Sequence, residues 1–417
     1  MKSILYISSI TVILFSGLYL YQENMAPEWR MHQLKYLDQI EARQAINSKQ
    51  KAAAYSFDIG LKQVWLPQMN RADRCISCHV ALEDPAFIHA AIPLKAHPGD
   101  YLQKHDAQTY GCTICHDGQG RAITWKAAAA DDADVSWDKP LLRKPFVQAN
   151  CYRCHTDDLD QTPDFNRGRQ TFETSGCLGC HKRGGKGGFV GPEFAGIGNA
   201  STHIKYPLKS FDPFTLTQFK GNLNLAYIYE SVRFPGAQPQ KTMMFDFKLS
   251  HAIAMELTVY LKSLASDQTG TQRLPPEPAY PLSLIETGSN MFKRYCTACH
   301  GKYARGGVKN PNYKNDFIPE LNTLAERMFL YKKDRREAVI AILDEFGDLL
   351  EAGPQSDIPG FFKVVAKYMP VENIILNGRV VERKNPKGIP PLNMPAWGAT
   401  ILDKDVSAVI AYLISVY

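Results

Sequence analysis

The sequence predicts a mainly α-helical protein with an N-terminal transmembrane helix, a loop-rich middle and two all-α domains toward the carboxyl end. Three observations indicate this fold class: an uncharged run at residues 3–22, five copies of one cysteine motif, and two similar segments in the last 250 residues. The 417 residues leave room for two to four domains. The content of 45% hydrophobic and 22% charged residues is that of globular rather than disordered protein. The formal net charge of +6 is spread along the chain, which argues against a nucleic-acid-binding protein.

The first 23 residues are expected to form a transmembrane signal-anchor helix. Residues 3–22 are long enough to span a bilayer, and Lys2 precedes them, so the amino terminus should stay in the cytoplasm. A cleaved signal peptide is the alternative, but no small-x-small cleavage site follows the apolar run. The predicted location is therefore the bacterial cytoplasmic membrane, with a single pass, the lipid bilayer as a partner and the bulk of the chain in the periplasm.

Residues 24–66 are expected to form a juxtamembrane helical segment. Leu34, Leu37 and Ile40 follow helical spacing, and Gly60 and Pro67 should interrupt or end the helices. Aromatic residues in this segment suggest packing against a partner, the lipid surface or the rest of the chain.

All ten cysteines fall into five copies of the pattern C-x-x-C-H. This pattern is the signature of covalent c-type haem attachment, in which two thiols bond one porphyrin and the adjacent histidine binds its iron. Five copies with no cysteine left over predict five covalently bound haem c groups. The attachment cysteines are Cys75, Cys78, Cys112, Cys115, Cys151, Cys154, Cys177, Cys180, Cys296 and Cys299. The proximal iron ligands are His79, His116, His155, His181 and His300.

Other uses of paired cysteines explain the pattern less well. A disulfide framework would not place a histidine after every pair, and structural zinc sites need an even number of C-x-x-C pairs. A redox-active C-x-x-C would not recur five times.

Residues 67–158 hold three motifs and are expected to form a triheme domain. The proximal histidines His79, His116 and His155 are 37 and 39 residues apart. So little polypeptide per motif leaves scarcely any room for a conventional core, and prolines divide the segment into short pieces. The porphyrins themselves should therefore fill much of the interior.

Residues 160–265 and 283–417 have the pattern of an internal repeat. Each begins with Gly and Phe before its motif, at Gly168 and Phe172 and again at Gly288 and Phe292. Each continues with a Gly- or Ile-Pro-Glu segment, a methionine and a final Tyr-Leu pair. The second copy contains an expected helical insertion over 331–369, and a proline-rich hinge over 275–281 separates the two copies.

This order of features closely resembles class I cytochrome c, twice. The resemblance implies two all-α cytochrome c domains in which the carbonyls of Pro192 and Pro319 accept hydrogen bonds from the proximal imidazoles. It also implies an axial methionine on each iron. Met394, followed by Pro395, matches the family pattern well. Met244 is preferred over Met243 in the first copy, where Phe245 stands in place of the proline.

The triheme segment offers histidines rather than methionines as distal ligands. His89, His97 and His105 lie between its first two motifs, and Met69 is its single methionine. Bis-histidine ligation is therefore expected. His32 could serve instead if the juxtamembrane helix folds back, whereas His203 and His251 are expected to be bystanders.

The whole chain resembles membrane-anchored multihaem cytochromes that are subunits of bacterial quinol-oxidising respiratory complexes. The resemblance implies electron transfer without a catalytic residue, a membrane-embedded quinol-oxidising b-type cytochrome as donor, and a soluble cytochrome or terminal oxidase as acceptor. Two alternatives remain: a multihaem peroxidase or nitrite- or sulfur-compound oxidoreductase with an open haem, and an extracellular haem wire.

Overall fold

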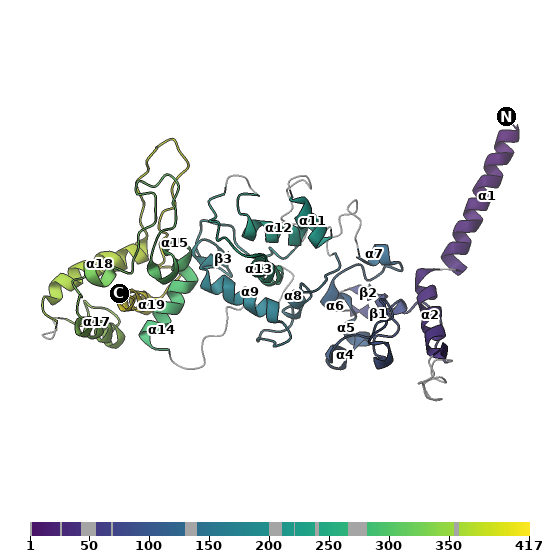
Figure 1. Ribbon diagram of the computed structural model, residues 1–417, viewed down its shortest axis with the longest axis horizontal. Coiled ribbons are helices and arrows are strands. Elements are labelled where there is room, and N and C mark those ends of the chain that lie inside the picture. Colours follow the sequence, from purple (N-terminus) through teal and green to yellow (C-terminus); the bar gives the residue numbers. More distant parts are fainter. Residues whose placement is uncertain are drawn as a thin grey trace. The chain divides into compact units, whose positions relative to one another are not determined.

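The computed structural model of the protein describes residues 2–25, 27–42, 56–67, 70–129, 140–199, 211–220, 222–237, 242–265, 282–353 and 358–417. These residues are largely helical and contain little strand (Figure 1). They form two compact units, of which the first comprises 1–151 with 216–222 and the second comprises 152–215 with 223–417.

Short elements dominate the first unit. Its helices and strands are α1 (Lys2–Met25), α2 (Glu28–Ala42), β1 (Val64–Leu66), β2 (Arg71–Asp73), η2 (Cys75–Ser77), η3 (Pro85–Phe87), α4 (Tyr101–Lys104), α5 (Ala107–Tyr110), α6 (Thr113–His116), α7 (Trp125–Ala129) and α8 (Gln148–Cys151). Helix α11 (Pro213–Phe219) contains residues of both units.

The second unit has longer helices. Its elements are α9 (Pro163–Thr174), η4 (Cys177–Gly179), β3 (Lys182–Arg183), β4 (Lys186–Gly187), α12 (Leu223–Arg233), α13 (His251–Lys262), α14 (Leu284–Met291), the π-helix η6 (Phe292–Cys296), α15 (Thr297–His300), η7 (Lys302–Ala304), α16 (Leu324–Arg327), α17 (Lys333–Phe346), α18 (Phe361–Asn377) and α19 (Asp403–Ser415).

The predicted membrane anchor is wrong. Within the described ranges, no helix is both long enough and apolar enough to cross a bilayer. Helix α1 covers the uncharged run, and on it Thr11 Oγ1 donates to the Ile7 carbonyl oxygen at 2.8 Å. The transmembrane signal-anchor helix over 1–23 and the single-pass location in the bacterial cytoplasmic membrane are therefore both withdrawn.

Residues 24–66 are only partly helical. Helix α2 ends at Ala42, and residues 43–55 lie outside the described part. Where a helix was expected to run up to Pro67, β1 instead pairs antiparallel with β2, and Trp65 lies opposite Ala72. The local sequence explains the strand, because Val64 and Leu66 are buried on one face while Trp65 is 53% exposed on the other.

One apolar cluster of the first unit is small. It consists of Ile40 from α2 together with Ala81, Phe87, Leu94 and Ala96. The four- and five-residue helices α4 to α8 contribute little apolar surface to it. Other buried apolar residues of the first unit lie outside this cluster, among them Leu66, Leu142 and Phe146.

Two helix crossings of the same kind organise the second unit. Helix α9 packs against α13, and α14 packs against α19 (Figure 1). A Cβ atom at Gly168 would lie 2.0 Å from the Glu256 carbonyl oxygen, and one at Gly288 would lie 1.8 Å from that of Ala408. Glycine therefore lets the two helices of each pair approach closely.

An aromatic pair accompanies each crossing. The rings of Phe172 and Tyr260 lie 5.0 Å apart, and those of Phe292 and Tyr412 lie 5.4 Å apart. Equivalent positions of the two sequence segments thus make equivalent contacts. The insertion expected over 331–369 contains α17 and the first part of α18, which continues to Asn377. The proline-rich hinge falls outside the described residues.

We predict that Gly168→Ala destabilises the protein. In an open helix, alanine in place of glycine stabilises by about 0.5–1 kcal/mol, but here the new methyl group collides with the α13 backbone. The expected loss is about 1–3 kcal/mol in the free energy of unfolding, measured by thermal unfolding followed by circular dichroism. Gly236→Ala, where a Cβ meets nothing within 4 Å, is the matched control. An equal or higher melting temperature for Gly168→Ala would contradict the close crossing.

Candidate functional site

Four of the five C-x-x-C-H motifs share one local geometry, a tight helical turn. The amide of His79 donates to the Cys75 carbonyl oxygen at 2.9 Å, and the corresponding distances are 2.9 Å for His116 and 3.0 Å for His181. The fifth motif forms helix α15, which ends at His300. Because residues i, i+3 and i+4 share a face of a helical turn, both sulfur atoms and the imidazole of a motif project to the same side. This is the arrangement needed to hold one porphyrin by two thioethers and one iron ligand.

Proline carbonyls orient the proximal histidines of the second unit. Nδ1 of His181 is hydrogen-bonded to the Pro192 carbonyl oxygen at 2.8 Å, and Nδ1 of His300 to that of Pro319 at 3.2 Å. Both hydrogen bonds were expected from the sequence. A proton held on Nδ1 leaves the Nε2 lone pair available for a metal ion.

The first two motifs use the same device with different acceptors. The imidazole of His79 is hydrogen-bonded to the backbone of Pro93, and that of His116 to the backbone of Leu142. Burial lowers the pKa of both rings, and these carbonyls only partly offset it. Burial likewise lowers the pKa of His181 and His300. All four imidazoles are therefore favoured in the neutral state that binds metals.

The motif cysteines differ in their pKa shifts: burial raises the pKa of several, whereas the hydrogen bond with Cys299 lowers that of Cys180. All ten are free of disulfide bonds. Burial raises the pKa of Cys177 and Cys296 to about 12 and that of Cys78 to about 11. The thiols of Cys177, Cys296 and Cys78 are therefore favoured in the protonated state.

The first and second motifs meet at a buried carboxylate. The Sγ atoms of Cys75 and Cys112 and an oxygen of Asp73 all lie within 4.8 Å of one another. The third motif begins close to the second, since Asn150 Nδ2 donates to the Cys115 carbonyl oxygen at 2.8 Å. Porphyrins attached to these cysteines would have neighbouring edges.

The fourth and fifth motifs also meet at their cysteines. The thiols of Cys180 and Cys299 are hydrogen-bonded to each other. A Cβ atom at Gly179 would lie 2.5 Å from the Tyr295 carbonyl oxygen, and one at Gly176 would lie 2.6 Å from the Ala298 amide nitrogen. Only glycine permits this approach, so the two repeats present their attachment sites to each other.

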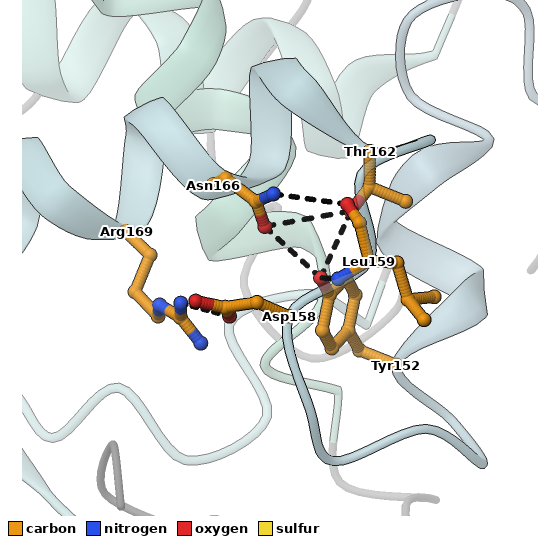
Figure 2. A network of polar contacts seen from close by, with 6 residues as sticks. All are labelled: Tyr152, Asp158, Leu159, Thr162, Asn166 and Arg169. Carbon is orange, nitrogen blue, oxygen red and sulfur yellow. Dashed lines mark hydrogen bonds and ion pairs between the residues drawn. The ribbon is translucent and has the colours of Figure 1, made fainter.

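The third motif is the most open one, and one of its intervening residues is held firmly. Cys154 and His155 are exposed. The Tyr152 ring stacks on Phe165 of α9 with centroids 3.4 Å apart. Figure 2 shows its hydroxyl group within hydrogen-bonding distance of Thr162 Oγ1 at 2.9 Å and Asn166 Oδ1 at 3.1 Å.

His97 lies next to the histidine of the second motif. Its ring centroid lies 6.3 Å from that of His116, with the rings 79° apart. Two imidazoles on opposite sides of one metal ion, with metal–nitrogen bonds of about 2 Å, place their centroids about 6 Å apart. Nδ1 of His97 is hydrogen-bonded to the Pro98 carbonyl oxygen at 3.0 Å, which leaves Nε2 for the metal.

The other candidate histidines of the first unit have different surroundings. Nδ1 of His105 is hydrogen-bonded to the Tyr101 carbonyl oxygen at 3.2 Å, and His89 is exposed. His32 lies on α2, which does fold back on the first motif: the neighbouring Gln33 donates to the Ser77 carbonyl oxygen at 2.9 Å. His32 thus remains a candidate for the first iron.

The candidate methionines and the two histidines expected to be bystanders differ in exposure and contacts. Met244 is half-buried, whereas Met243 is 44% exposed. Met394 is half-buried and pairs with Arg379 through two backbone hydrogen bonds. Nδ1 of His251 lies 2.8 Å from the Tyr229 hydroxyl group, and His203 lies outside the described residues.

Sequence reasoning missed the polar side chains that join the motifs. Asp73, Asn150 and Gln33 each bond to the backbone of a motif. A local signal existed only for Asp73, since an aspartate just before a helical turn is a typical N-cap.

Comparisons with protein-family models, with curated proteins and with solved structures give no match to this chain. The functional argument therefore depends on the motifs and their geometry.

We predict that Tyr152→Phe lowers the free energy of unfolding by about 1–3 kcal/mol, because Thr162, which is 1% exposed, and Asn166 lose a hydrogen-bond partner. Chemical denaturation measures the loss. Tyr110→Phe changes an exposed tyrosine and is the control. Equal stabilities for the two variants would show that the network in Figure 2 contributes nothing.

Proposed function

We propose that this chain is a five-haem c-type cytochrome that relays electrons from haem to haem. The observation that carries the proposal is the pairing of motifs at their cysteines, around Asp73 in the first unit and at Cys180 and Cys299 in the second. Each bound haem supplies an iron atom that gains and loses one electron reversibly. A relay from haem to haem needs such centres close to one another, whereas a protein that uses a single haem does not.

The chain's own residues set the conditions for this role. The carbonyls of Pro192 and Pro319 hold the proton of the proximal imidazole on Nδ1, which fixes the tautomer and raises the basicity of the ligand. Met244 and Met394 are the proposed axial ligands in the two repeats. His97, His105 and His89 are proposed for the triheme segment, and His32 of α2 is the alternative for its first iron. Methionine ligation raises the reduction potential, so electrons would flow from the triheme segment toward the repeats.

We further propose a quinol-oxidising b-type cytochrome as the electron donor and a soluble cytochrome or terminal oxidase as the acceptor. The resemblance of the motif arrangement to cytochrome subunits of respiratory complexes supports these partners.

The covalent haem content tests the proposal. The protein, produced in cells with a c-type maturation system, should have a denatured mass equal to 46.8 kDa plus five haem groups, and a pyridine haemochrome spectrum of five haems per chain. Cys296→Ala/Cys299→Ala should carry four. A wild-type mass equal to that of the bare polypeptide would refute the function.

We predict that His97→Ala converts one low-spin ferric haem to high spin without loss of covalent haem. The optical and electron paramagnetic resonance spectra report the change, and the open iron should then bind carbon monoxide when reduced. His251→Ala, at an exposed histidine bonded to Tyr229, should leave every haem low-spin. If His97→Ala also stays fully low-spin, another residue is the ligand. A wild-type protein with a high-spin haem would favour a redox enzyme instead.

A further inference from the structure

Asp73 links the turns of two different C-x-x-C-H motifs. It is the last residue of β2 and is only 1% exposed. Oδ1 accepts from the Cys75 amide at 3.0 Å, and Oδ2 accepts from the amides of Cys112 and Thr113, both at 2.8 Å. One side chain therefore caps the amino-terminal ends of both turns, whose amides would otherwise lack partners.

The surrounding backbone is shaped for this carboxylate. Gly111, directly before Cys112, has a φ of +63°, and a Cβ atom there would lie 3.0 Å from Oδ2 and 2.9 Å from Leu66 Cδ1. The Arg74 amide donates to the Gly120 carbonyl oxygen at 2.8 Å, which ties the residue after Asp73 to the chain beyond the second motif.

The carboxylate is charged despite its burial. Burial acts to raise the pKa of Asp73, but the hydrogen bonds that its oxygens accept outweigh it in the chain with free thiols, so the pKa lies below its usual value. The three backbone amides that donate to this carboxylate remain when the Cys75 sulfur is a thioether, and they continue to favour the charged form. A buried negative charge beside a redox centre favours the oxidised state, because ferric iron carries one more positive charge than ferrous iron.

A cation site is a weaker explanation of the same cluster. The two thiols near Asp73 belong to the haem motifs, and the carboxylate oxygens already accept three amide hydrogen bonds.

We propose that Asp73 is a positioning residue that fixes the spacing of the first two haem motifs and lowers the reduction potentials of both haems. This inference rests on the proposed function. One side chain would thus hold the two motif turns at a fixed spacing, and its charge would lower the reduction potential of both haems.

The test is a redox titration of the full-length holoprotein carrying Asp73→Asn, followed optically. We expect two of the five haems to titrate at higher potential and the other three to be unchanged, with all five haems still attached. Asp84→Asn is the matched control, since Asp84 caps η3 through a single bond from Ala86 at 3.0 Å and contacts neither motif turn. Its potentials should equal those of the wild type.

The outcomes separate the two hypotheses. Five attached haems in the wild type with unchanged potentials in Asp73→Asn would overturn the role of Asp73 and leave the proposed function standing. A shift of only one haem would overturn the link between the motifs. If Asp73→Asn fails to mature, Asp73→Glu keeps the charge but lengthens the side chain. Loss of haem from Cys75 and Cys112 peptides together would then support the joint positioning, and loss from one alone would contradict it.

Discussion

The hydrogen bond from a motif imidazole to a backbone carbonyl, present at four of the five motifs, is the constraint on which the rest of the structure depends. It fixes where a motif turn lies relative to a segment downstream in the sequence, as His181 does with Pro192 and His300 with Pro319. The helical turn then determines which way the two sulfur atoms of that motif project. The sulfur atoms and the imidazole of a turn therefore share one face, and packing of one turn on another uses the rest of its surface.

The two halves of the chain achieve this packing by different means. In the first unit a charged side chain, Asp73, joins two turns through their amides, and the apolar cluster around Phe87 is small. In the second unit the helices carry ordinary cores, and glycines at the crossings bring backbones together, with the Arg167–Glu256 ion pair beside the first crossing. Electrostatic joining suits a segment with little core, whereas close apolar contact suits long helices.

Local features were predictable from the sequence, and long-range ones were not. The motif turns follow from the spacing within each motif, whereas the proline acceptors and the glycine–aromatic crossings were implied by the resemblance to class I cytochrome c. The pairing of motifs depends on residues such as Asp73 and Gly179, whose contacts lie far along the chain and carry no periodic signal. The strand β1 was missed because three residues are too few to show alternation. The membrane anchor was wrong because absence of charge over residues 3–22 was taken as equivalent to sufficient apolar character.

The close approach at Gly176 and Gly179 also couples the two repeated segments when either one is altered. A backbone surface of one segment meets the other there, so one added methyl group would collide with the backbone of Tyr295 or Ala298. A side chain at either glycine therefore requires a matching shift of backbone in the other segment, and neither segment can change its shape at this contact alone.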